Sequence, residues 1–154
     1  MRYMLVTLGL MLTPLACAAG IRASELSIGG VGSGATEASV VKRLGSPAKR
    51  LETGDGIELH YSDLVVTIGW IDPEAPGRQR RVVAIYGTGS KACTPKGLCP
   101  GMPSSEAARL YGHVEPTLRE TGTFLEYQPA GANCWLKVSA PSGVVQSLAV
   151  AYQP

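Results

Sequence analysis

An internal repeat constrains the fold of this chain more than any other feature of its sequence. Residues 34–45 (GATEASVVKRLG) and residues 101–112 (GMPSSEAARLYG) both run from glycine to glycine over the same length. The match continues downstream, where Leu64–Gly69 corresponds to Cys134–Ser139, and the offset stays between 63 and 70 residues. Self-similarity at a near-constant offset is typical of a chain built from repeated structural units. We therefore interpret the sequence as a tandem duplication.

The glycine-to-glycine segment of each copy predicts a short amphipathic helix. Thr36 can cap the first helix, and Gly45 and Gly112 follow the two helices at the position that favours positive φ. Pro103 stands where Thr36 stands in the first copy, so the second helix is expected to begin at Ser104 or to use Pro103 in its first turn. The two copies would occupy residues 24–90 and 91–154, as one compact unit.

Three short, β-branched or aromatic runs follow each helix and predict strands. They are residues 57–61, 64–70 and 81–86 in the first copy, and 123–127, 133–139 and 144–152 in the second. Because no helical pattern separates these runs, the strands should form antiparallel meanders. The predicted fold is α+β, with two tandem αβββ repeats that form one antiparallel sheet of about six strands and two short helices on one face. The proline-rich segment 71–80 should be an exposed loop.

This pattern of glycine-bounded helix, strand ending in tyrosine and meander resembles the small outer-membrane assembly lipoproteins of the BamE type. Its tandem form resembles the secreted β-lactamase inhibitor proteins. The similarity covers most of residues 28–152 and rests on helix-capping and core positions, so it implies a fold more than a function. The cysteine placement and the shorter strands depart from the inhibitor pattern, and inhibition of a β-lactamase is not carried over.

The first residues read as an export signal. Arg2 precedes an apolar run from Met4 to Leu12, and small residues follow. This is the layout of a secretory signal peptide in residues 1–18, with cleavage after Ala18 or as late as Ala23. The alternative is lipidation of Cys17, which would make an outer-membrane lipoprotein. No other stretch is apolar enough for a transmembrane segment, so we expect a periplasmic or secreted protein.

The cysteines suggest a disulfide in the exported protein. Cys93 and Cys99 flank a turn-rich loop that can close a short bridge. Cys134 lies on a predicted strand and is either a free buried thiol or an alternative partner for one of the other two. His113 is available as a base for a catalytic cysteine, but nothing in the sequence links it to a thiol.

Other chemistry finds little support in the sequence. The formal net charge is +2, which argues against a nucleic-acid binder. The histidine and cysteine spacing suggests no metal site, and we expect no cofactor. Residues 30–35 (GVGSGA) fit the dinucleotide-binding glycine pattern, but the preceding run Glu25–Ile28 is short and polar and no parallel crossover follows. We interpret this segment as a flexible lead-in to the first helix.

The open face of the predicted sheet is the candidate binding site. If Val66, Ile68, Leu136 and Val138 point at the helices, the period of two in a strand directs other residues to the opposite face. These residues are Val65, Thr67, Trp135, Lys137, His60, Tyr86 and Phe124. Aromatic side chains with a lysine on a solvated sheet are typical of a protein-binding patch. Alternatively, loop 71–80 or the N-terminal segment covers this face.

The sequence therefore favours a non-enzymatic exported module that binds another protein, for example as an inhibitor or immunity-type protein. The alternatives are a lipid-anchored envelope-assembly or scaffold factor and, less favoured, a small envelope enzyme. No nucleic-acid partner is expected.

Overall fold

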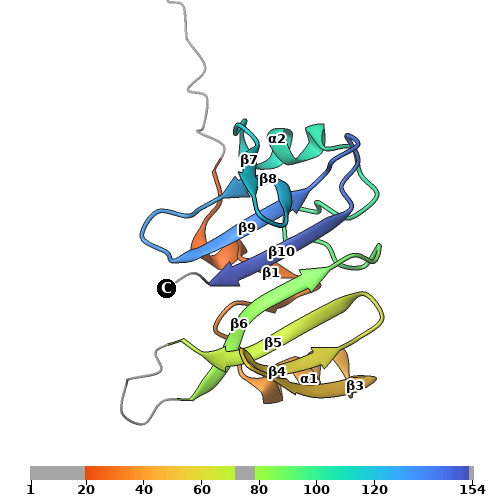
Figure 1. The fold of residues 1–154 in the computed structure, drawn as a ribbon, viewed down its shortest axis with the longest axis vertical. Helices are drawn as coiled ribbons and strands as arrows, with labels where there is room; N and C mark the ends of the chain where they lie inside the picture. The colour runs from red at the N-terminus through yellow and green to blue at the C-terminus, as the bar shows by residue number, and fades with distance from the viewer. Residues whose placement is uncertain (1–19, 72–78, 153–154) are drawn as a thin grey trace, which may run out of the picture.

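The computed structural model describes residues 20–71 and 79–152 of the chain (Figure 1). The first half contains η1 (Ala23–Glu25), β1 (Ser27–Ile28), β2 (Val31–Gly32), α1 (Glu37–Leu44), β3 (Lys49–Thr53), β4 (Gly56–His60), β5 (Leu64–Trp70) and β6 (Arg80–Gly87). The second half contains α2 (Ser105–Tyr111), β7 (Thr117–Arg119), β8 (Gly122–Tyr127), β9 (Cys134–Ser139) and β10 (Ser147–Tyr152).

The main sheet is antiparallel and has eight strands in the order β3-β4-β5-β6-β10-β9-β8-β7. Each half contributes one helix followed by four strands, and the halves meet at β6 and β10 (Figure 1). The prediction of a mixed fold with short helices and antiparallel strands is confirmed. The predicted sheet of about six strands is too small, because each half has one strand more than the three predicted.

The additional strands are β3 and β7, which form the two edges of the sheet. In β3 only Leu51 is not exposed, and Leu118 and Arg119 of β7 are exposed. Sequence patterns identify a strand by its buried alternate side chains, and these edge strands have almost none. Charged, short edge strands also protect an open sheet from pairing with other chains.

The helices begin and end largely as the sequence predicts. The Thr36 hydroxyl accepts a hydrogen bond of 3.1 Å from the backbone N–H of Ser39, which caps α1. Gly45 and Gly112 end the helices with φ of 83° and 96°. The second helix begins at Ser105, one residue later than predicted, and Pro103 lies just before it with its carbonyl accepting from the N–H of Glu106 at 3.0 Å.

The core lies between one face of the sheet and the helices. Val66 and Ile68 of β5 and Leu136 and Val138 of β9 are fully buried, as predicted. The helices join the same core cluster through Val40 of α1 and Ala107 and Tyr111 of α2. Both helices therefore pack on one face of the sheet, which we call the inner face, and we call the other the open face.

The N-terminal segment packs on the inner face as a small hairpin. β1 and β2 pair with each other, and Gly29 and Gly30 at their turn have φ of 60° and 78°. Ile28 and Val31 are buried in the core, and β1 contacts both β6 and β10. The expectation of a flexible lead-in is wrong, because these apolar side chains dock against the sheet. The hairpin is antiparallel, so the glycine pattern in residues 30–35 lacks the parallel crossover of a dinucleotide site.

Strand pairing changes one detail of the internal repeat. Tyr61 and Tyr127 occupy matching positions in the two copies. Tyr61 donates its N–H to the carbonyl of Leu64, whereas Tyr127 pairs with Leu136. Leu64 is therefore the counterpart of Leu136, and not of Cys134 as the sequence comparison predicts. The second half accommodates the difference in the longer connection between β8 and β9. The last strand also begins at Ser147, later than the predicted residue 144.

Candidate functional site

The candidate site is the open face of the sheet, where strand register arranges the predicted residues in rows. Directly paired residues on neighbouring strands direct their side chains to the same face. The longest row runs across the sheet through His60, Val65, Tyr86, Ala149, Lys137 and Glu126. Four of the seven predicted residues, His60, Val65, Tyr86 and Lys137, therefore lie in this one row, which crosses strands from both halves.

The other three predicted residues lie on the same face. Thr67 pairs with Ala84, Ala84 with Ala151, and Ala151 with Trp135, in a row next to the first. Phe124 pairs with Ser139, two positions along β9 from Lys137. The alternation inferred from the sequence thus places all seven residues on the open face.

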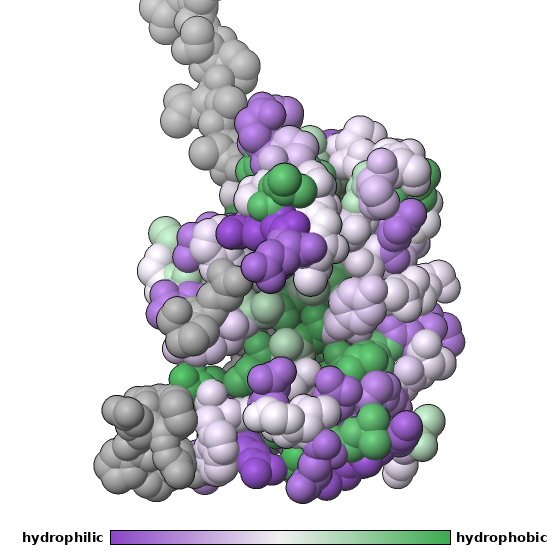
Figure 2. Space-filling view, in the orientation of Figure 1, coloured by the Kyte–Doolittle hydropathy of each residue, from purple (hydrophilic) through white to green (hydrophobic). Residues whose placement is uncertain are grey.

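The face has an apolar centre between two groups of paired charges. In the first half His60 Nε2 lies 2.9 Å from Glu58 Oε2. In the second half Arg119 donates two hydrogen bonds to the carboxylate of Glu126, at 2.6 and 3.0 Å, and Lys137 Nζ lies 3.7 Å from Glu126 Oε1. Figure 2 shows the corresponding pattern, with apolar surface over β6 and β10 and hydrophilic surface above and below.

Glu126 contacts both cations of the charged group in the second half, Arg119 and Lys137. Its side chain is only 4% exposed, although it lies on the open face. The hydrogen bonds from Arg119 lower the pKa of this carboxyl, against the opposing effect of partial burial, and the charges of Arg119 and Lys137 add to the lowering. Glu126 is therefore held as a carboxylate that fixes the position of both cations.

Among the seven predicted residues, exposure is greatest at the centre of the face. Tyr86 is 49% exposed, whereas the other six predicted residues are partly buried by their neighbours. The described part of the N-terminal segment packs on the inner face, so residues 20–35 do not cover this site. Most of the loop 71–80 lies outside the described residues.

A depression at one end of the open face adds residues beyond the seven predicted ones. It has a volume of about 390 Å³ and is lined by Asp55, Thr67, Trp70, Ile71, Val83, Ala84 and Tyr152. The pairing of β5 with β6 shifts between Thr67 and Ile68, and this bulge changes the alternation at Val83. No signal in the sequence marks the bulge, although Trp70 and Ile71 are large apolar residues at the end of a predicted strand.

The cysteines form the predicted bridge. Cys93 and Cys99 are joined in a disulfide, with a sequence separation of 6. Cys134 is free and half-buried, with its Sγ 3.3 Å from the Ser33 hydroxyl. Its alternative role as a disulfide partner is therefore wrong. His113 is exposed and lies 3.1 Å from Glu115. Cys17, the candidate for lipidation, lies outside the described residues.

Residues 20–71 and 79–152 contain no group of three or more His, Cys, Asp or Glu side chains that could hold a metal ion. In the same ranges, no helix has both the length and the apolar character needed to cross a membrane.

Comparison with known proteins gives a likeness in fold. No family model matches the chain, and no curated protein matches it. The 1.5 Å crystal structure of an extracellular protein that contains an SCP domain, from Bacillus anthracis str. Ames, is similar with a TM-score of 0.53 and 8% sequence identity. The match covers 97% of this chain and 50% of that chain, so this chain spans about half the length of that protein. At this identity the likeness concerns the fold alone.

Proposed function

We propose that this protein is a non-enzymatic binding module that uses the open face of its sheet to hold another protein. The observation that carries the proposal is the apolar centre around Tyr86 and Ala149, with paired charges at Glu58–His60 and at Arg119–Glu126–Lys137 on either side. Protein interfaces commonly combine an apolar core that contains aromatic residues with a polar rim. The paired charges keep the rim polar, and the rigid sheet spends little conformational entropy on binding.

We propose that the protein acts in the periplasm or outside the cell. The leader-like residues 1–18 support export, although they lie outside the described residues. The Cys93–Cys99 disulfide is compatible with an oxidising compartment. The extracellular character of the structural neighbour agrees with this location.

In the most concrete form of this proposal, the partner is a toxin or hydrolase that the module neutralises. The tandem arrangement of one helix and a meander in each half supports the resemblance to the BamE-type lipoproteins and the secreted inhibitor proteins as a proposal about ancestry. A lipid anchor on Cys17 would instead favour an envelope-assembly or scaffold role. Both roles use the same open face.

Site-specific photo-crosslinking tests the proposed face. A crosslinking amino acid replaces Tyr86 in the exported full-length chain, and in the control it replaces Leu118. Leu118 is 80% exposed and pairs with Thr123, so it points away from the open face. We expect a discrete crosslinked protein from position 86 and none from position 118. Equal crosslinking at the two positions would contradict the proposal.

A variant experiment then tests the residues themselves. Tyr86→Ala combined with Trp135→Ala should abolish capture of the crosslinked partner by the tagged protein. Both side chains lie outside the buried core, so cooperative thermal unfolding should persist. Capture that is unchanged in this double variant would exclude the apolar centre as the binding site.

A further inference from the structure

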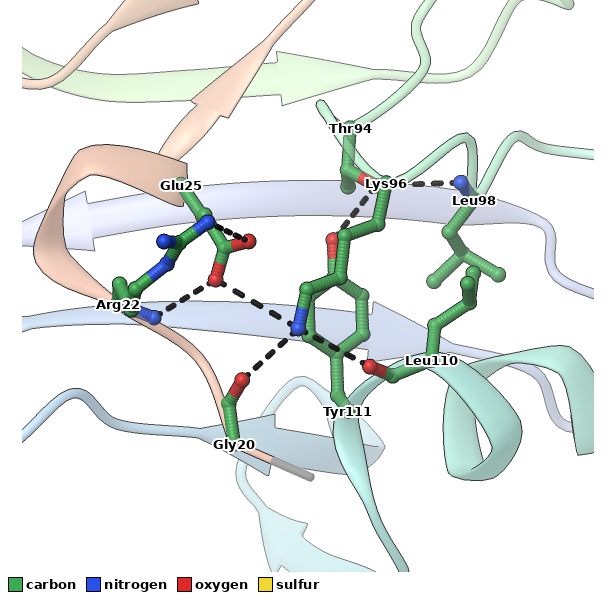
Figure 3. Close-up of polar contacts among 8 residues, drawn as sticks. All are labelled: Gly20, Arg22, Glu25, Thr94, Lys96, Leu98, Leu110 and Tyr111. Carbon is green, nitrogen blue, oxygen red and sulfur yellow. Dashed lines mark hydrogen bonds and ion pairs between the residues drawn. The ribbon is translucent and has the colours of Figure 1, made fainter. Parts of the chain in front are cut away.

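The segment from Gly20 to Glu25 is in contact with the folded domain (Figure 3). Glu25 ends the short helix η1 and accepts a hydrogen bond of 2.8 Å from the backbone N–H of Arg22. The Arg22 guanidinium also donates to Glu25, at 3.2 Å. Ile21 packs against the hydrophobic core. The first described residues therefore make specific contacts with the folded domain.

Lys96 connects this segment to the rest of the protein. It lies in the loop closed by the Cys93–Cys99 disulfide, and its ammonium donates to the carbonyl of Gly20 at 2.9 Å and to that of Leu110 at 3.1 Å (Figure 3). The same Nζ lies 3.6 Å from Glu25 Oε2 and 4.7 Å from the centre of the Tyr111 ring. One cation thus joins the N-terminal segment, the disulfide loop and the last turn of α2.

Glu25 depends on these partners because it is 5% exposed. Burial alone raises the pKa of its carboxyl, but hydrogen bonds from Arg22 and the charges of Lys96 and Arg22 outweigh burial and leave the pKa below its ordinary value. A buried carboxylate that loses its partners is strongly destabilising. The contacts of Arg22 and Lys96 with Glu25 therefore stabilise the fold, because they offset the cost of burying this carboxylate.

The two cleavage sites compatible with the sequence differ in what they leave of this network. A cut after Ala23 removes the carbonyl of Gly20, the side chain of Ile21 and both donors of Arg22. Lys96 then loses an acceptor, and Glu25 loses two hydrogen bonds inside the protein. A cut after Ala18, a residue outside the described ranges, leaves the network whole.

We infer that signal peptidase processes this chain after Ala18, and that Gly20–Ala23 belong to the mature domain. The inference rests on the proposed export of the protein. It assigns residues 20–23 a structural role, as the segment that donates hydrogen bonds to Glu25, accepts one from Lys96 and packs Ile21 against the core. The leader is then expected to end immediately before the first residues that the fold uses.

Mass spectrometry of the mature protein tests this inference. The full chain is expressed with its own leader in a bacterium that exports it, and the intact mass is measured from the envelope and the medium. We expect a mature chain that begins at Ala19. A chain that begins at Ser24 would overturn the inference and leave export intact, whereas a mass that begins at Met1 would contradict export itself. A diacylated Cys17 as first residue would overturn cleavage after Ala18.

A matched pair of leader variants provides an independent readout. Signal peptidase requires a small residue directly before the cut, so Ala18→Leu should block or slow processing. Ala23→Leu should leave the rate of processing and the mature N-terminus unchanged, because Ala23 is exposed and lies beyond the expected cut. The opposite result, with Ala23→Leu accumulating as precursor, would place the cut after Ala23 and overturn the inference.

Discussion

Tyr86 and Ala149 lie directly opposite each other on β6 and β10, the strand pair at which the two halves of the sheet meet. Because Leu64 corresponds to Leu136, Val66 corresponds to Val138, and their paired residues Ile85 and Leu148 correspond as well. Ile85 and Leu148 each immediately precede one member of the pair. The pair therefore lies at the point about which the two halves are approximately related by a two-fold rotation. The exposed centre of the open face belongs equally to both halves.

Ala149→Arg tests binding at this junction. The new side chain would stand between Tyr86 and Lys137, its neighbours in register, and would place a like charge beside Lys137. Affinity for the protein crosslinked at position 86 should fall at least tenfold, about 1.4 kcal/mol. Titration calorimetry measures the change. Ala149→Ser is the control and should retain the affinity, and equal affinity in both variants would argue against this face.

Gly56 and Gly122 offer a matched test of backbone strain. They begin β4 and β8 with nearly the same φ, 137° and 134°. A Cβ on Gly56 would collide with the carbonyl oxygen of Ile68, whereas a Cβ on Gly122 has its nearest contact at 3.9 Å. Each alanine substitution should cost about 1–3 kcal/mol from φ alone. Gly56→Ala should cost more in urea unfolding, and equal losses would contradict the collision.

Two buried tyrosines should respond differently to loss of the hydroxyl. Tyr111 donates a hydrogen bond of 2.7 Å to the Thr94 hydroxyl, whereas the buried Tyr127 hydroxyl has no hydrogen-bond partner among the described residues. Tyr111→Phe should therefore lower the free energy of unfolding by about 1 kcal/mol. Tyr127→Phe should leave it unchanged or raise it. A loss at Tyr127 as large as at Tyr111 would reveal a partner for that hydroxyl, such as an ordered water.

Removal of the disulfide should loosen a segment far from it in sequence. Replacing Cys93 and Cys99 with serine removes a disulfide of sequence separation 6. Loss of this short loop closure should lower the free energy of unfolding by about 2 kcal/mol. Because Lys96 lies in this loop and holds the Gly20 carbonyl, amide exchange in residues 20–25 should also accelerate. Cys134→Ser is the control that keeps the loop closed. Faster exchange confined to residues 93–99 would contradict the connection.

Acid should weaken the Arg119–Glu126 pair. Hydrogen bonds from Arg119 hold the pKa of Glu126 below its ordinary value, so the unfolded chain takes up this proton at a higher pH than the folded one. The stabilisation is complete above the unfolded pKa of about 4.3 and is lost as pH falls through the folded pKa. Glu126→Gln should thus show a smaller loss of unfolding free energy between about pH 5 and pH 3.

Two comparisons sharpen this measurement. Glu120→Gln, in the exposed turn before β8, should keep the pH dependence of the original protein. Glu25 and Glu106 also have lowered pKa values, but they are present in every variant and their contribution cancels in the difference. Parallel stability curves for Glu126→Gln and the original chain would exclude Glu126 as a source of the acid sensitivity.

The sequence contains enough information for the buried strands and for the faces of the sheet. Val66, Ile68, Leu136 and Val138 alternate with less buried residues, and alternation alone assigns their neighbours to the open face. The Cys93–Cys99 bridge was also predictable, because a short turn-rich loop brings the two residues together. These features depend on residues that are close in sequence, so a single sequence is enough to predict them.

The remaining features depend on contacts between distant segments. The edge strand β3 lacks an apolar face of its own and is defined by its pairing with β4. The bulge at Thr67 appears only when β5 pairs with β6. Likewise, no pattern in residues 20–25 predicts that Glu25 is buried beside Lys96, because the two residues come into contact only in the folded chain.

The hairpin formed by β1 and β2 also has a consequence for the order of folding. Its first strand contacts β6 and β10 together, so its docking surface is complete only when the last described strand has paired. During synthesis the hairpin leaves the ribosome early and must wait for nearly the whole chain to follow. Contacts of such long sequence separation slow folding. In a chain that stays extended until it has crossed a membrane, all strands become available together and this delay would not arise.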